Sequence, residues 1–184
     1  MTVSKGNWFE NQSEVERAIN GKVTVEHGAG VIGTGVAPKT TRYYLNNDII
    51  TDIAIDLTGL NSKNTANDVI GLSTGGVAYI GRNVVANNGI IYKIELICLE
   101  TPAGGDDDVN VVANVSATLE FDGAGGTTYG VNGGDGVAGQ VVANLVQGLT
   151  ANHYFYLTAG TGDTADTYTA GQYIVRLHGR KVLS

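Results

Sequence analysis

Short apolar runs with a two-residue period, separated by glycine-rich turns, limit most strongly how this chain can fold. In Ile49–Thr58, the apolar residues Ile53, Ile55 and Leu57 alternate with polar or small residues, as in a strand with one face in water. The chain has 27 glycines among 184 residues, and Ser13–Asn20 is its one candidate helix. The sequence therefore predicts an all-β fold.

Two segments indicate how the strands are arranged. Ile90–Glu100 is partly apolar on both faces, which predicts a strand in the middle of a sheet, and in Gln172–His178 every second residue is predicted to face the core. Strands with no helices between them favour an antiparallel β-sandwich, with a jelly roll as the leading topology and Asp122–Gly139 as a long loop. The other predicted strands are Thr41–Leu45, Val77–Ile80, Val109–Val115, Ala117–Phe121, Gln140–Val146 and His153–Thr158.

The first 39 residues are predicted to form an arm. A capping box opens the short helix Ser13–Asn20, and the residues after it are short apolar pieces broken by glycines, which cannot build a core alone. We therefore assign residues 1–39 to an N-terminal arm and residues 40–184 to a β domain. Trp8 and Phe9 are interpreted either as anchors of the arm or as part of the core of the domain.

The charge pattern argues against nucleic acid and membranes as partners. The net charge is −7, and Lys and Arg are scattered singly, so no basic stripe is present to contact a phosphate backbone. No run approaches the ~20 apolar residues that cross a bilayer, and the N-terminus lacks the apolar stretch of a secretory signal. We expect synthesis in a cytoplasm, with neither kind of partner.

Two motifs match catalytic or cofactor-binding patterns, but their surroundings do not fit. Gly28–Gly33 matches the dinucleotide motif G-x-G-x-x-G, yet the residues after it cannot form the helix that would hold a pyrophosphate. Gly71–Gly75 matches the nucleophile elbow G-x-S-x-G, yet a strand-like segment follows it. We expect no enzyme activity and no cofactor; an esterase built on Ser73 is kept as an alternative.

The candidate metal ligands and the single thiol also favour structural roles. Asp106–Asp108 offers part of a Ca²⁺-loop spacing, and we interpret it as a solvated acidic turn, with a weak cation site left open. His27, His153 and His178 are too widely separated, and too poor in local ligands, to indicate zinc. Cys98, the only cysteine, lies in an apolar run and is predicted to be a buried thiol.

Short segments near both ends of the chain form a recognisable set, namely Gly6–Glu10, Ile32–Tyr44, Ile49–Leu60, Tyr154–Gly160, Tyr168–Gly171 and Tyr173–Leu177. These segments resemble structural proteins of tailed bacteriophages of marine bacteria, while the glycine-rich middle differs. The similar motifs specify no enzyme, so the resemblance implies a component of the virion.

Within that class, size and charge favour a capsid decoration, or cement, protein. A small acidic β domain suits the outside of a shell, because its charge is wrong for lining packaged DNA. Trp8, Phe9, Val31 and Ile32 are predicted to dock the arm on neighbouring subunits. The expected partners are the major capsid protein and further copies of this chain, as a homotrimer on the capsid exterior. A neck, tail or fibre-base subunit is the alternative.

Overall fold

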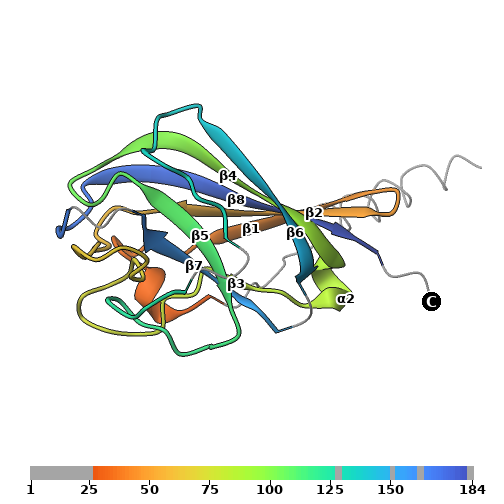
Figure 1. The fold of residues 1–184 in the computed structure, drawn as a ribbon, viewed down its shortest axis with the longest axis horizontal. Helices are drawn as coiled ribbons and strands as arrows, with labels where there is room; N and C mark the ends of the chain where they lie inside the picture. The colour runs from red at the N-terminus through yellow and green to blue at the C-terminus, as the bar shows by residue number, and fades with distance from the viewer. Residues whose placement is uncertain (1–26, 127–129, 150–151, 161–163, 182–184) are drawn as a thin grey trace, which may run out of the picture.

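The computed structural model describes residues 27–126, 130–149, 152–160 and 164–181, and in this part the regular secondary structure is almost entirely antiparallel β-strand (Figure 1). Helix is limited there to a 3-10 turn, η1 (Ala29–Val31), and a single α-helical turn, α2 (Val85–Asn88). The predicted all-β fold is therefore confirmed. The predicted helix Ser13–Asn20 lies outside the described residues.

The larger sheet has five antiparallel strands in the order β1-β2-β8-β4-β6. Its strands are β1 (Lys39–Leu45), β2 (Asp48–Asp56), β8 (Ala170–Arg180), β4 (Ile90–Ala103) and β6 (Val141–Leu149). Because β4 lies between β8 and β6, the prediction that its segment is a central strand is confirmed. Strands β1 and β6 form the two edges of this sheet.

The smaller sheet has three antiparallel strands in the order β3-β7-β5, namely β3 (Gly81–Arg82), β7 (Tyr154–Ala159) and β5 (Val109–Asn114). Part of the predicted long loop adds to its edge. Val131 and Val111 exchange two backbone hydrogen bonds, of 2.8 Å and 2.9 Å. The part of this glycine-rich segment around Val131 is therefore bonded to β5.

Inward-facing side chains of both sheets form a single hydrophobic core. Tyr173, Val175 and Leu177 of β8 are at most 2% exposed, as their alternation predicted. They share the core with Phe155 of β7 and Val111 of β5, which are fully buried. Burying side chains of this size contributes roughly 1.5–3 kcal/mol each, before conformational entropy is counted.

A β-bulge in β4 changes which of its side chains face the core. The register with both neighbouring strands shifts between Ile91 and Lys93, so Ile91 and Ile94 are both buried. Strict alternation places Tyr92 on the same face as Ile94, but Tyr92 instead lies beside His178, with 6.1 Å between the ring centroids. An inserted bulge residue explains this difference from the sequence pattern.

The described part of the predicted arm is packed into the β domain. The Gly28 N–H donates to the carbonyl of Tyr79, and the Gly30 N–H to that of Val77, each at 2.8 Å. These bonds hold η1 against the domain and turn Val31 into the core. The rest of the predicted arm, residues 1–26, lies outside the described residues.

Cys98 is buried on β4, at 2% exposure, as predicted, and its Sγ lies 3.3 Å from the carbonyl oxygen of Glu100. Burial raises the pKa of this thiol, so little reactive thiolate is present at neutral pH. We expect the native protein to react with a disulfide-forming thiol reagent at least ~100-fold more slowly than the urea-unfolded chain. Absorbance of the released thiol measures this, and equal rates would contradict the buried position.

Candidate binding surface

The face of the five-stranded sheet that points away from the core, called the outer face below, is the candidate binding surface. The strand register arranges its side chains in rows that cross the sheet from β1 to β6. The three central rows are Tyr43–Ile50–His178–Lys93–Leu145, Thr41–Asp52–Arg176–Glu95–Ala143 and Lys39–Ala54–Ile174–Ile97–Val141.

Ion pairs connect the middle of the outer face. Arg176 donates two hydrogen bonds to Asp52, from Nε to Oδ1 at 2.7 Å and from Nη2 to Oδ2 at 2.8 Å. Glu95 lies 2.6 Å from Lys93 Nζ and 3.2 Å from His178 Nε2. These five side chains are between 12% and 34% exposed. Since the charges already compensate one another, covering them costs less than covering unpaired charges.

Apolar side chains surround the ion pairs. Of the ten large apolar side chains that are exposed in the described part of the chain, five lie on the outer face. A sheet face in water normally carries mainly polar residues, whereas a gathering of exposed apolar groups marks an interaction surface. The five residues, with their exposed fractions, are Tyr43 (44%), Leu45 (62%), Ile90 (51%), Val141 (57%) and Leu145 (74%).

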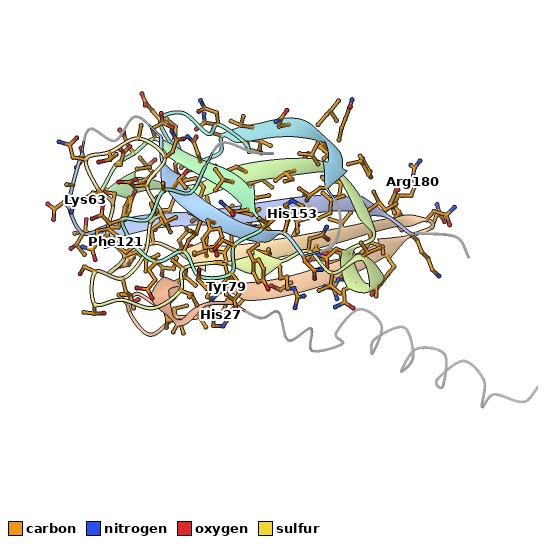
Figure 2. All side chains as sticks on the ribbon, turned by 60° about the horizontal axis from the view of Figure 1, so that its bottom comes forward. His27, Lys63, Tyr79, Phe121, His153 and Arg180 are labelled. Atoms are coloured by element: carbon orange, nitrogen blue, oxygen red, sulfur yellow. The ribbon has the colours of Figure 1, made fainter. Side chains whose placement is uncertain are left out.

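The outer face continues to the end of the molecule where Figure 2 shows Arg180, opposite the end that carries Lys63 and Phe121. The guanidinium of Arg180 lies 5.7 Å from the centre of the Tyr92 ring and 3.3 Å from the carboxylate of Asp48. At the opposite end, Lys63 lies over the Phe121 ring, at 5.9 Å. The cationic groups of Arg180 and Lys63 therefore both contact side chains of their own chain.

Acid should weaken the ion pairs of the outer face. Burial raises the pKa of Glu95, but contacts with Lys93 and His178 outweigh burial and hold its pKa below the ordinary value of 4.5. A carboxylate with a lowered folded-state pKa stabilises the fold above its unfolded pKa, and this contribution is lost as the pH falls through the folded value.

We therefore expect Glu95→Gln to lower the free energy of unfolding by about 1 kcal/mol at pH 7, and by clearly less at pH 3. Urea unfolding of both proteins at the two pH values measures the difference. The same loss at both pH values would mean that the ionised carboxylate does not stabilise the fold.

The residues predicted as interface anchors lie in different places. Trp8 and Phe9 are outside the described residues, and Ile32 is half-buried. Val31 is 1% exposed in the core of its own chain, so it is not available to a neighbouring subunit, and this part of the prediction is wrong. The reason is the pairing of η1 with residues 77–79, which the sequence did not indicate. The outer face was missed because its rows join strands that are distant in sequence.

The two enzyme-like motifs lack the geometry that their chemistry needs. Gly28–Gly33 forms only the short turn η1, and no α-helix opens there. Ser73 lies in an exposed turn, where its backbone N–H donates to Asn61 Oδ1 at 3.2 Å, and the next element is the strand β3. Both observations agree with the interpretation of these motifs as non-catalytic.

The interpretation of Asp106–Asp108 as a solvated turn is right for Asp107, which is exposed, and wrong for its two neighbours. Asp106 is fully buried and Asp108 is 7% exposed. The Asp106 N–H donates to Ser62 Oγ at 2.9 Å, and the Tyr168 hydroxyl donates to the Asp106 carbonyl at 2.7 Å. These contacts fold the turn into the protein. In the described part of the chain, no three His, Cys, Asp or Glu side chains are placed to hold a metal ion.

Comparison of the chain with known protein families, with curated proteins and with solved structures finds no match. Within the residues that the structure describes, no helix is both long and apolar enough to span a membrane.

Proposed function

We propose that this protein is a structural component of a tailed-bacteriophage virion, and that it is a capsid decoration protein that binds the major capsid protein on the outside of the shell. The observation that carries the proposal is the outer face, which combines exposed apolar side chains with ion pairs that are already neutralised. The phage-like motifs at both ends of the chain supply the class of partner.

The size of the outer face is sufficient for a stable interface. Five strands and about nine residues of strand length correspond to roughly 24 Å by 30 Å, or about 700 Å². Specific interfaces of standard size bury about 600–1,000 Å² on each partner. Contact over the whole outer face would therefore reach the lower part of this range without an enzyme-like cleft.

We further propose that the two sheets form a β-sandwich with jelly-roll connections and that the protein assembles as a homotrimer. The edge strands β1 and β6 support self-association, since open edges that a neighbouring copy covers are protected from unspecific pairing. The net charge of −7 favours the exterior of the shell, because it repels the packaged DNA inside.

Cryo-electron microscopy of the phage particle that carries this protein tests the proposal. Density for the β domain at regular sites over the outer shell, with the outer face against the capsid subunits, is the expected result. Density only at the neck or along the tail would overturn the capsid role and favour a tail subunit. Regular shell sites with the outer face turned to solvent would overturn the assigned surface but not the role.

A further inference from the structure

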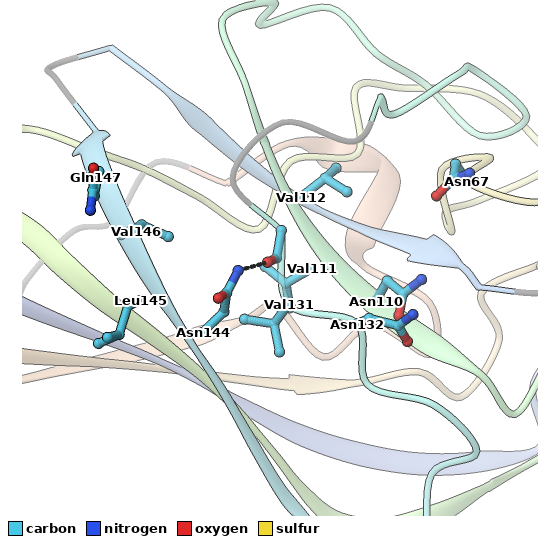
Figure 3. Close-up of a pocket in the computed structure, with 11 residues that line it drawn as sticks. Asn67, Asn110, Val111, Val112, Val131, Asn132, Asn144, Leu145, Val146 and Gln147 are labelled. Atoms are coloured by element: carbon cyan, nitrogen blue, oxygen red, sulfur yellow. Dashed lines mark hydrogen bonds between the residues drawn. The ribbon is translucent and has the colours of Figure 1, made fainter.

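A second, separate feature is a pocket of about 540 Å³ between the edge strand β6 and strand β5 (Figure 3). Its walls are residues 144–147 of β6, residues 110–112 of β5 and the segment 130–132 that pairs with β5, while Asn67 lies at the side away from β6. The volume is within the range of pockets that bind small organic ligands. The pocket does not depend on the capsid role proposed above.

The polar groups of the pocket are carboxamides. None of the described lining residues is charged, so a bound anion or cation would find no opposite charge and would lose its hydration without compensation. Each carboxamide both donates and accepts hydrogen bonds in one plane, as a neutral ligand with several hydroxyl groups requires. The carboxamide residues are Asn67, Asn110, Asn132, Asn144 and Gln147.

Hydrogen bonds to the backbone fix the orientation of three of these amides. Asn110 Oδ1 accepts the backbone N–H of Gly133 at 2.8 Å, and Asn132 Oδ1 accepts that of Gly134 at 3.1 Å. Asn144 donates from Nδ2 to the carbonyl of Gly130 at 2.7 Å, the bond drawn in Figure 3. Among the described residues, the Nδ2 groups of Asn110 and Asn132 and the Oδ1 of Asn144 have no further hydrogen-bond partner, so they can bind a ligand. Preset orientations reduce the entropy lost on binding.

Buried valines supply the apolar part of the same pocket. Val111, Val112, Val131 and Val146 line it and are at most 6% exposed. A sugar ring has apolar C–H faces and a rim of hydroxyl groups, so it can contact the accessible edges of Val112 and Val146, which are 3% and 6% exposed, together with the carboxamides. We propose that the pocket between β5 and β6 binds a neutral carbohydrate, such as the end of a neutral oligosaccharide.

Titration of the ¹⁵N-labelled full chain with lactose, maltose and mannobiose tests this, followed by NMR of the side-chain amide signals. Saturable shifts of the Asn110, Asn132 and Asn144 signals are expected with at least one sugar, with a dissociation constant on the order of 1 mM. No saturable shift with any of the sugars would overturn the proposal. Shifts caused by a neutral capped dipeptide and not by the sugars would overturn it in favour of a peptide site.

Two exposed positions allow a matched set of variants. Asn132→Asp keeps the oxygen that accepts the loop N–H but removes the Nδ2 donor, and Asn144→Leu removes the Oδ1 acceptor together with the Nδ2 bond to Gly130. Each variant should bind the responsive sugar about tenfold more weakly. Asn132→Asp should keep its melting temperature, and Asn144→Leu should lower it slightly, because one exposed hydrogen bond is lost. Asn87→Asp, an exposed amide on α2 outside the pocket, makes the same charge change and should bind like the wild type. Unchanged binding in both pocket variants would overturn the proposal.

Discussion

Val141→Glu is expected to weaken binding of this protein to purified phage shells that lack it by about 100-fold, or ~2.7 kcal/mol. Val141 is 57% exposed and ends the apolar row that also contains Ile97 and Ile174. In the docked state, the new carboxylate would be removed from water with no cation beside it in that row, and burying an unpaired charge is costly. In the free protein the side chain stays in solvent, so the melting temperature should be nearly unchanged.

Val115→Glu is the matched control for this experiment. Val115 directly follows β5 in the smaller sheet and is 74% exposed. Its substitution makes the same change of size and charge as Val141→Glu, but away from the outer face. Co-sedimentation with shells measures binding, and thermal unfolding measures stability. If both variants bound shells as tightly as the wild type, the outer face would not be the docking surface. If both bound more weakly than the wild type by the same factor, the effect would come from net charge alone.

Gly28→Ala is expected to lower the free energy of unfolding of the isolated protein by about 3 kcal/mol. A Cβ atom at this position would lie 1.8 Å from the carbonyl oxygen of Val77, so the backbone pairing that holds η1 must shift. Urea unfolding followed by circular dichroism measures this change. The experiment also distinguishes a packed segment from a docking arm, because a free arm would tolerate the extra methyl group.

Gly35→Ala is the control for the glycine experiment. Gly35 has a φ of +84° but no atom within 4 Å of an added Cβ, so only the left-handed backbone conformation opposes the substitution. We expect a loss of about 1 kcal/mol at this position. An equal or smaller loss at Gly28 would contradict the close approach between η1 and residues 77–79.

Predictions based on local alternation were the most successful. The side chains of Tyr173, Val175 and Leu177 face the core as their spacing indicates, and the segment of β4 is central in its sheet. A strand buries every second residue whichever neighbour it pairs with, so period and burial can be inferred from the strand itself. The predicted strands Val77–Ile80 and Ala117–Phe121 instead meet at the single bridge between Val77 and Glu120 and at the bond from the Ala78 N–H to the Leu119 carbonyl, which are too few pairs for a strand.

The all-β class, the central strand, the buried thiol of Cys98 and the acidic charge were thus determined by the sequence itself, through alternation, composition and the scarcity of helix-forming segments. The burial of Asp106 and Val31 and the bulge beside Tyr92 were decided by the tertiary structure. The tertiary structure also decided the rows of the outer face and the pocket between β5 and β6. Each of these depends on the register between segments far apart in the chain, and local patterns carry little information about register.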